Sequence, residues 1–368
     1  MPTYHALALF SGGLDSILAS TLMQSLGQQV LGIHFISPFF GHPERVHAWE
    51  QEYSLPIMPV DIGQEFVDMM SAFPPHGFGK VLNPCVDCKI LMLRQAKKLL
   101  PDFGASYIIS GEVLGQRPMS QRADTLHIIR NKAQVRDVLL RPLSAGLLPP
   151  TPMEESGLVN RSALLSISGR GRTQQYALAQ SLGITTIPAQ AGGCRLGERE
   201  SVRRYWPIFQ AICEPRVDNF DLANVGRQLW HRHNNLPLHW LVIGRDNADN
   251  ERLLPLARPD DYIFMLADFP GPLALARPTR DAWPIALVQE AASCVVSFAP
   301  KARKAGGPVR VIVRHNNKEW PLWVPPPFAH NFAEPPAWSQ TRECIRAKTK
   351  ELSQAVCSKT CIETDTQE

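Results

Sequence analysis

An apolar run that ends in a glycine turn and a helix constrains the fold of this chain most. Residues 5–10 have the length and composition of a buried strand, and residues 16–26 have helical apolar spacing, with Gly27 as a natural stop. Ser11-Gly12-Gly13-Leu14-Asp15-Ser16 lies at the junction. The glycines let backbone N–H groups approach an anion, and the helix N-terminus adds a positive dipole end. The junction therefore predicts a phosphate site.

The strand–helix alternation continues through the first 200 residues. We expect further strands at 30–36, 56–60 and 107–110, and helices at 44–53, 84–100 and 174–182. Such alternation predicts an α/β fold, with a doubly wound, mostly parallel sheet that binds ligands beyond the carboxyl ends of its strands.

A second pattern begins near residue 215. Strands at 240–243, 262–266 and 309–313 and a helix at 287–298 predict a smaller α+β domain. Three proline residues at 325–327 then introduce a polar tail. We predict domains at 1–200 and 215–325, followed by a Pro-rich linker and partly disordered tail at 326–368, with one helix at 339–353.

Composition limits the classes of function. The net charge of +4 on 368 residues permits a nucleic-acid partner without requiring one. No apolar run reaches the length that spans a bilayer, and the first residues lack the pattern of a signal peptide, so we expect a cytoplasmic protein without a membrane partner. Eight cysteines in that compartment favour thiols, metal ligands or catalysts over disulfides.

The glycine turn is not a Walker A loop, because it lacks the Gly-Lys-Ser/Thr ending. It resembles the PP-loop of the ATP pyrophosphatases, which include tRNA thiouridylases, tRNA-lysidine synthetase and GMP synthetase. The resemblance implies that the loop holds the β,γ-pyrophosphate of ATP while a substrate attacks the α-phosphate. A carboxylate facing phosphates suits Mg²⁺, so Asp15 is predicted to be catalytic. A structural turn with a helix cap is the alternative. The predicted ATP-binding residues of the loop are Ser11, Gly12, Gly13, Asp15 and Ser16.

Two later strand ends complete the predicted nucleotide site. His34 and Phe35 end the second strand, where this fold usually meets adenine, although they could be ordinary strand-end residues. Ser110-Gly111-Glu112 closes a later strand and looks like the nucleotide loop of the thiouridylases, with a structural turn as the alternative. We therefore expect His34, Phe35 and Gly111 to contact ATP.

Three cysteines form the second chemical motif. Cys85 and Cys88 are one turn apart at the expected start of a helix, a position that lowers thiol pKa values. Cys194 follows Ala191-Gly192-Gly193 in a glycine-rich loop. Two thiols suffice for a persulfide relay, and three can hold a 4Fe–4S cluster with one iron open. Zinc would normally recruit a fourth ligand. Cys213 and Cys294 have apolar neighbours and are expected to be buried.

The spacing Asn-Pro-Cys-x-x-Cys with a later lone cysteine is similar to the tRNA thiouridylases of the 2-thiouridylase and 4-thiouridine synthetase types. Many 2-thiouridylases carry aspartate in place of Cys85, and use the residues matching Cys88 and Cys194 without a cluster. Cysteine at position 85 makes this chain more similar to the iron–sulfur-dependent thiolases. The resemblance implies that Cys85, Cys88 and Cys194 are catalytic and bind a 4Fe–4S cluster. It also implies sulfur transfer to a tRNA uridine through adenylation of the base carbonyl and displacement of AMP, with sulfide or a cysteine desulfurase as sulfur donor.

Basic residues in two regions are predicted to contact RNA phosphates, with solvated loops as the alternative. In the first domain these are Arg117, Arg170 and Arg172. Short segments in 220–315 follow the order found in the NFACT-R domain, a predicted RNA-binding module of ribosome quality-control proteins. That resemblance implies phosphate contacts by Arg245, Lys301 and Arg303.

Two other functions remain open from the sequence. One is a PP-loop enzyme that adenylates a small molecule, although simple amidation needs no thiols. The other is a translation-linked RNA-binding adaptor whose nucleotide domain senses ATP, although a sensor needs neither Asp15 nor three cysteines. The sequence does not indicate an oligomeric state.

Overall fold

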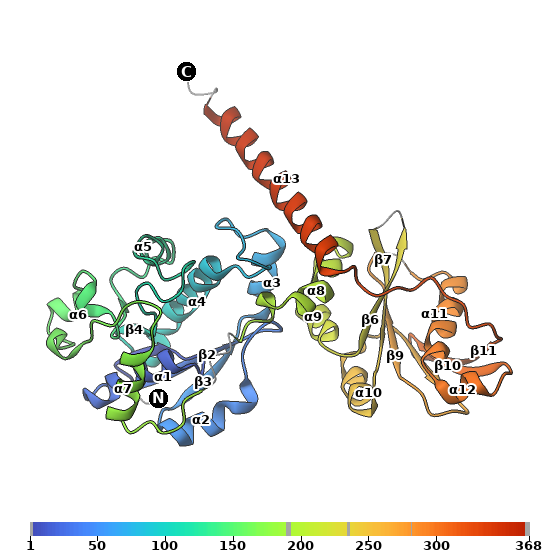
Figure 1. The fold of residues 1–368 in the computed structure, drawn as a ribbon, viewed down its shortest axis with the longest axis horizontal. Helices are drawn as coiled ribbons and strands as arrows, with labels where there is room; N and C mark the ends of the chain where they lie inside the picture. Colours follow the sequence, from blue (N-terminus) through green and yellow to red (C-terminus); the bar gives the residue numbers. More distant parts are fainter. Residues whose placement is uncertain (1–2, 189–192, 234–235, 281, 365–368) are drawn as a thin grey trace. The chain divides into compact units, whose positions relative to one another are not determined.

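The chain folds into two compact units, residues 1–197 and 198–368, in a computed structural model that describes residues 3–188, 193–233, 236–280 and 282–364 (Figure 1). We call them the first and the second unit. The second unit begins with the helices α8 (Arg199–Ala211) and α9 (Val217–Ala223). The predicted first domain ended at residue 200, within α8.

The first unit is built on a parallel sheet with strand order β3-β2-β1-β4-β5. The expected strands at 30–36 and 107–110 coincide with β2 and β4, and the predicted doubly wound α/β fold is confirmed. The strands are β1 (Ala6–Leu9), β2 (Val30–Ile36), β3 (Ile57–Asp61), β4 (Tyr107–Ser110) and β5 (Leu139–Leu140).

Alternating side chains of β1 create the two faces of this sheet. Ala6 and Ala8 enter one core with side chains of α1 and α7, whereas Leu7 and Leu9 enter a second core with α4 and α5. Helices therefore cover both faces, as the alternation predicts. The α-helices of this unit are α1 (Leu14–Ser25), α2 (Val46–Tyr53), α3 (Gly63–Ser71), α4 (Cys85–Leu99), α5 (Ala123–Lys132), α6 (Pro152–Glu155) and α7 (Thr173–Ser181).

The second unit contains an antiparallel sheet with strand order β11-β10-β8-β9-β7-β6. The apolar face of α11 packs on it and closes a core with Leu241, Phe264 and Val311. This is the smaller α+β domain that was expected. Its strands and remaining helices are β6 (Arg227–His233), β7 (Leu236–Ile243), α10 (Asn247–Leu253), β8 (Tyr262–Leu266), β9 (Ala274–Arg277), α11 (Ile285–Ser297), α12 (Pro300–Lys304), β10 (Val309–His315) and β11 (Lys318–Val324).

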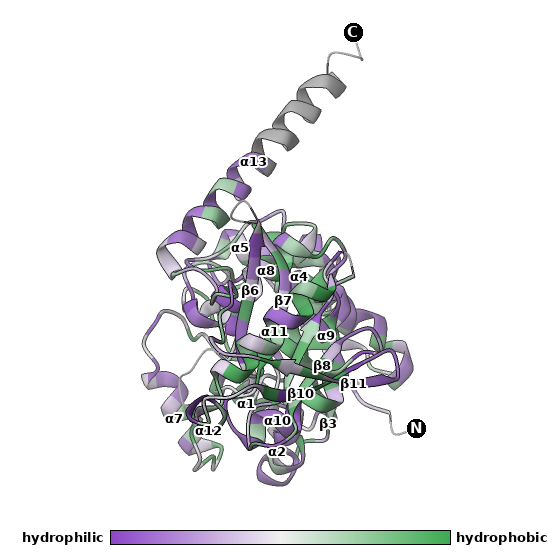
Figure 2. Cartoon of the chain, turned by 90° about the vertical axis from the view of Figure 1, so that its right-hand side faces the viewer, coloured by the Kyte–Doolittle hydropathy of each residue, from purple (hydrophilic) through white to green (hydrophobic). Residues whose placement is uncertain are grey.

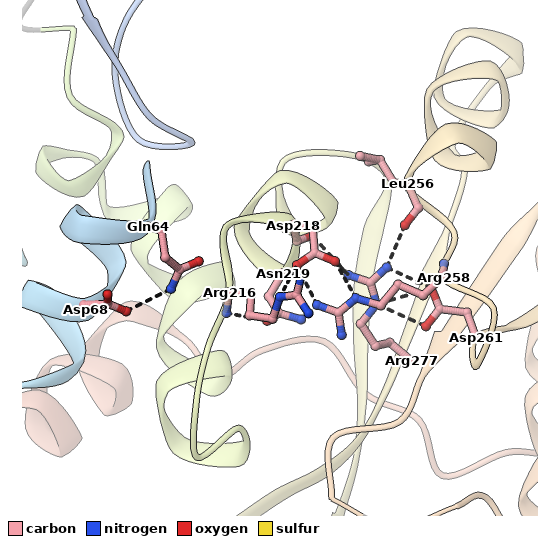
Figure 3. A network of polar contacts seen from close by, with 9 residues as sticks. All are labelled: Gln64, Asp68, Arg216, Asp218, Asn219, Leu256, Arg258, Asp261 and Arg277. Atoms are coloured by element: carbon pink, nitrogen blue, oxygen red, sulfur yellow. Dashed lines mark hydrogen bonds and ion pairs between the residues drawn. The ribbon is translucent and has the colours of Figure 1, made fainter. Parts of the chain in front are cut away.

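A buried ionic network ties the start of α9 to this sheet (Figure 3). Arg277 on β9 and Asp261 before β8 are fully buried, and Nη2 of Arg277 donates to Oδ2 of Asp261 over 2.8 Å. Asp218 on α9 receives hydrogen bonds from Arg258, and its backbone oxygen accepts one from Arg277. Two buried charges are stable there because each has a partner of opposite sign.

The C-terminal segment does not form the expected free linker at its start. Phe332 is buried in the core of the second unit, and Ala333 exchanges two backbone hydrogen bonds with Trp230 on β6. The chain continues as α13 (Trp338–Thr364), longer than the expected helix, and its described side chains are mostly hydrophilic (Figure 2). In the first turns of α13, the side chains of Thr341 and Ile345 are buried. Within the described residues, no helix is both long and apolar enough to cross a membrane.

Candidate active site

The turn between β1 and α1 brings backbone close to an aromatic ring. Gly12 has φ of +71°, which only glycine adopts without strain. A Cβ added there would lie 2.3 Å from the ring of Trp49 on α2. Both constraints require glycine at this position, so residue 12 itself places no side chain over the turn.

Two serine hydroxyls hold this turn in shape. Ser16 Oγ donates to the backbone oxygen of Gly13 over 2.7 Å and accepts from the backbone N–H of Ser11 over 3.2 Å. Gly13 is the N-cap of α1 and no side chain caps the helix. The first N–H groups of α1 therefore have no partner within the helix, and they provide the positive end that an anion needs.

Asp15 lies in the first turn of α1, with its carboxylate held from one side only. Oδ2 accepts a 2.8 Å hydrogen bond from Nε2 of Gln116, whereas Oδ1 is buried without a hydrogen-bond partner. Gln175 on α7 is fully buried, and its Nε2 lies 3.4 Å from Oε1 of Gln116. A buried, unpartnered carboxylate oxygen beside an open helix N-terminus fits a cation that neutralises phosphate charge.

The loop after β4 touches the same turn. A Cβ on Gly111 would lie 2.4 Å from the backbone oxygen of Asp15, so the two loops meet backbone to backbone. The next residue, Glu112, is buried and accepts hydrogen bonds from Arg141 (2.9 Å) and Ser110 (3.2 Å). Burial would raise the pKa of Glu112, but Arg141 and then Lys89 keep it below its usual value. The structure thus places Gly111 beside the predicted phosphate loop.

His34 and Phe35 have structural partners in this arrangement. One ring nitrogen of His34 pairs with the backbone oxygen of Phe10 (2.9 Å), and the other accepts from the N–H of His42 (2.8 Å). Burial lowers the pKa of His34, which agrees with a neutral ring. Phe35 packs in the core beneath α4. Adenine contact at this strand end stays a prediction that neither side chain supports.

Cys85 and Cys88 occupy the first turn of α4, as the spacing predicts, with Pro84 as N-cap. Nδ2 of Asn83 lies 3.0 Å from Sγ of Cys85 and can donate to it. The chain around Cys194 returns beside this helix start, because the backbone N–H of Leu82 donates to the oxygen of Leu196. Ala191 and Gly192 lie outside the described residues.

The three thiols interact electrostatically. Burial raises the pKa of Cys88 well above its usual range, Cys194 and Cys85 raise it further, and Lys89 acts in the opposite direction. The expected lowering by the helix N-terminus is therefore wrong for Cys88, because desolvation outweighs the helix dipole. The same Lys89 acts on Glu112, so the start of α4 lies within electrostatic reach of the loop after β4.

The donor chemistry of the three cysteines suits a metal, but their arrangement does not enclose one. Mutual repulsion and burial of thiolates are relieved when a cation binds them. Within the described residues, however, no group of three His, Cys, Asp or Glu side chains is placed to hold a metal ion. The predicted 4Fe–4S cluster on Cys85, Cys88 and Cys194 is thus unsupported by this geometry.

Several site residues were missed from the sequence. Asp87, one residue before Cys88, is buried and accepts from the N–H (3.1 Å) and Nδ1 (2.8 Å) of His76, which orients that ring. Gln116, Gln175 and Arg141 were missed as well. Of these three, only Gln116 could have been suspected from the sequence, because it directly precedes Arg117, a predicted RNA contact.

The predicted basic residues of the first unit lie close to the loops of the site. Gly169 donates to the backbone oxygen of Leu114, so the loop bearing Arg170 and Arg172 runs beside the one bearing Arg117. Arg117 and Arg170 are exposed and Arg172 is half-buried. None of the three forms an ion pair in the part of the chain that the structure describes.

The basic residues of the second unit divide into two kinds. Arg245 makes a bidentate pair with the buried carboxylate of Asp249, with Nε and Nη2 donating over 2.5 Å and 3.1 Å. The guanidinium of Arg245 therefore has a structural partner within its own unit. Lys301 and Arg303 on α12 are exposed. Cys294 is buried as predicted, but Cys213 is exposed, because its apolar neighbours are the last residues of α8 and the chain turns outward after them.

One family model matches within the first unit. Residues 3–146 fit the family model described as "Thiamine biosynthesis protein (ThiI)". A "Probable tRNA sulfurtransferase" of Thermococcus kodakarensis is 28% identical over 147 residues, which cover 37% of this chain and 36% of the relative. A protein of the same name from Methanosarcina mazei is 32% identical over 130 residues, 33% of this chain and 31% of the relative. The chain therefore spans about a third of the length of these curated relatives.

Among solved structures, the U34-tRNA thiolase NcsA from Methanococcus maripaludis, solved with its 4Fe–4S cluster, is 12% identical, with a TM-score of 0.29 over 52% of this chain and 61% of the other. The family match and the curated relatives confirm the predicted resemblance to the PP-loop tRNA sulfurtransferases for residues 3–146. The resemblance of the second unit to the NFACT-R domain stays a prediction.

Proposed function

We propose that this chain, whose first 146 residues are similar to tRNA sulfurtransferases, transfers sulfur to a uridine of tRNA at the expense of ATP, in the cytoplasm. The base carbonyl oxygen attacks the α-phosphate and pyrophosphate leaves. A sulfur nucleophile then displaces AMP from the same carbon. Adenylation is needed because oxygen leaves readily as AMP and poorly on its own.

One observation carries the proposal: Asp15 presents a buried, unpartnered oxygen where Gly111 and the open N-terminus of α1 meet. Backbone N–H groups of this turn would bind the terminal phosphates, with Gly12 leaving room for them. Asp15 would hold Mg²⁺, which supplies charge neutralisation when bound. The fixed donors contribute positioning and electrostatic stabilisation of the transition state.

The thiols of Cys85, Cys88 and Cys194 would deliver the sulfur, with Lys89 linking them to the nucleotide loops. A 4Fe–4S cluster held by the three thiolates is our first assignment for the sulfur carrier. It requires the three thiols to lie closer together than they do in this structure. A persulfide relay on two of them is the alternative.

Release of pyrophosphate that depends on tRNA tests the adenylation step. The purified chain with Mg²⁺, ATP, sulfide and bulk tRNA should release pyrophosphate and form AMP, and Asp15→Asn should slow both by about 100-fold. Asp102→Asn, an exposed carboxylate remote from the loop in sequence, is the matched control and should leave the rate unchanged. AMP formed only when a small-molecule cell extract replaces tRNA would instead indicate a small-molecule acceptor, and no AMP with either acceptor would leave the ATP-sensing adaptor.

Thionucleosides in cellular tRNA test the sulfur step. In a deletion strain, the wild-type chain and Cys213→Ala should restore a thionucleoside measured by mass spectrometry, whereas Cys88→Ala should not. Iron and sulfide analysis of anaerobically purified wild type and Cys88→Ala then separates the two carriers. Iron bound only by the wild type supports the cluster, and its absence from an active protein assigns the relay.

The RNA contacts of the second unit belong to the same proposal. Lys301 and Arg303 are exposed on α12 and remain assigned to RNA phosphates, whereas Arg245 is assigned to Asp249. Replacing Lys301 and Arg303 by glutamine should weaken tRNA binding. It should also reduce the slope of log affinity against log salt concentration by about two, because two phosphate contacts are lost. An unchanged salt slope would remove α12 from the interface.

A further inference from the structure

A small cavity beside β5 is lined by two arginines that no part of the proposed function uses. It has a volume of about 30 Å³ and lies between α5, the end of β5 and residues 145–154. Its apolar walls include Leu126, Leu139 and Leu148. The volume suits a small polyatomic ion and is too small for a nucleotide. His127 and Pro149 on its lining are exposed, so solvent ions can reach it.

The first arginine, Arg141, is almost completely buried, with 6% of its side chain exposed. Nε of Arg141 donates to Glu112, but Nη2 is buried and has no hydrogen-bond partner. A guanidinium N–H left without a partner in an apolar wall costs free energy that a bound acceptor would recover.

The second arginine, Arg130 on α5, is also incompletely paired. Its Nε is buried without a hydrogen-bond partner among the described residues, and its Nη2 lies 3.1 Å from Nδ1 of His127. Arg130 forms no ion pair with a carboxylate among the described residues. Burial and then the charge of Arg141 lower its pKa, which shows that the two guanidiniums repel each other.

The carboxylate in the cavity wall does not resolve this repulsion. Glu154 is fully buried, and its oxygens accept from the N–H of Thr151 (2.8 Å), from Oγ1 of Thr151 (2.6 Å) and from Arg161. It is thus neutralised by Arg161 and has no close contact with Arg130 or Arg141. Arg130 is therefore the uncompensated charge on the lining, because Glu112 pairs with Arg141 and Glu154 pairs with Arg161.

We propose that this cavity binds a phosphate group between Arg130 and Arg141. Guanidiniums match the oxygens of phosphate in geometry and charge. Because Glu112 already pairs with Arg141, the uncompensated positive charge that a phosphate would meet is that of Arg130. The phosphate is either a free ion or a phosphate of the RNA backbone at the cavity mouth. Because Arg141 also holds Glu112, next to Gly111, occupancy of the cavity would be transmitted to the nucleotide loop.

Titration of the full chain with inorganic phosphate, at constant ionic strength and without ATP, tests the site independently of the proposed enzyme activity. We expect calorimetry to detect binding by the wild type and an affinity about tenfold weaker in Arg130→Gln. Lys98→Gln is the matched control, because Lys98 is exposed, does not line the cavity and removes one positive charge as Arg130→Gln does. Circular dichroism verifies that each variant is folded. Arg130→Lys keeps the charge but lacks the planar guanidinium that can donate two parallel hydrogen bonds, so it should bind phosphate with intermediate affinity.

Binding of tRNA to the same variants identifies the source of the phosphate. If Arg130→Gln weakens phosphate binding alone, the ligand is the free ion. If it also weakens tRNA binding and reduces the salt slope by about one, the ligand is an RNA phosphate. If neither phosphate nor tRNA binding differs between Arg130→Gln and Lys98→Gln, the proposal is wrong, whatever the outcome of the sulfur-transfer assays.

Discussion

At the scale of single residues, Gly12 shows how a steric requirement creates a binding surface. Its positive φ turns the backbone, and the absence of a side chain lets the turn pack on Trp49. A ring that close to the backbone excludes water from one side of the turn. The N–H groups on the other side then face the place where phosphates would bind.

Gly12→Ala should destabilise the first unit by roughly 3 kcal/mol, because the new Cβ overlaps the ring of Trp49 and an L-residue is strained at this φ. Gly27→Ala is the matched control. Gly27 also has positive φ (+80°), but nothing lies within 4 Å of the added Cβ, so only about 1 kcal/mol should be lost. Urea unfolding measures both, and equal losses would show that the contact with Trp49 is not important.

At the scale of elements, α7 acts on the site through a chain of amides. It packs against α1 and delivers Gln175, which contacts Gln116, which in turn holds Asp15. Gln175→Ala should therefore reduce the rate of AMP formation several-fold and raise the Mg²⁺ concentration needed for half the maximal rate. The exposed neighbour Gln174→Ala should change neither. A loss of rate without a shift in Mg²⁺ dependence would indicate that α7 only supports the fold.

Elements with a local signal were predicted well, and those set by distant partners were not. The strands β2 and β4 are mostly apolar runs bounded by turn residues, so their limits could be read directly from the sequence. The strand β11 contains Pro321, which argues against a strand unless it lies at an edge, and β11 is the edge of its sheet. That position depends on pairing with β10, which the sequence of β11 does not encode.

The same distinction applies to the site. The phosphate loop is contiguous and carries its own turn chemistry, so its residues could be named from the sequence. Gln116 is 101 residues from Asp15 along the chain, and Gln175 is 59 residues from Gln116. The pairing of β1 with β4 and the packing of α7 bring the three side chains together. The pKa of Cys88 likewise depended on burial, which helix position alone did not indicate.

The start of α10 gives a prediction for pH dependence. Hydrogen bonding to Arg245 lowers the pKa of Asp249 to about 2, and Asp249 accepts the backbone N–H of Arg245 as well. A carboxyl group with a lowered folded-state pKa stabilises the fold above its unfolded value of about 4 and loses that contribution as the pH falls to about 2.

Asp249→Asn should therefore lower the melting temperature at neutral pH, and its difference from the wild type should shrink between pH 4 and pH 2. The exposed pair of Asp268 and Arg310 offers the control, because Asp268→Asn should have little effect at any pH. Thermal unfolding followed by circular dichroism measures both. A difference for Asp249→Asn that is constant down to pH 2 would contradict the assigned pKa.

At the scale of the whole molecule, the two units have separate hydrophobic cores, and this separation has a measurable consequence. Seven of the eight tryptophans lie in the second unit, so fluorescence reports mainly on its unfolding. ATP with Mg²⁺ should stabilise the unit that carries the phosphate loop. The two transitions can thus be assigned within the full chain.

Arg277→Met should destabilise the second unit by about 3–5 kcal/mol, because it leaves Asp261 buried without its partner (Figure 3). Fluorescence should show a lower midpoint in urea, while the transition that responds to ATP stays in place. Adding Asp261→Asn to this variant should recover part of the loss, since no unpaired carboxylate then remains, and Arg310→Met serves as the exposed control. Movement of both transitions by the same amount would mean that the units unfold as one, and that the ionic network supports the fold of the phosphate loop too.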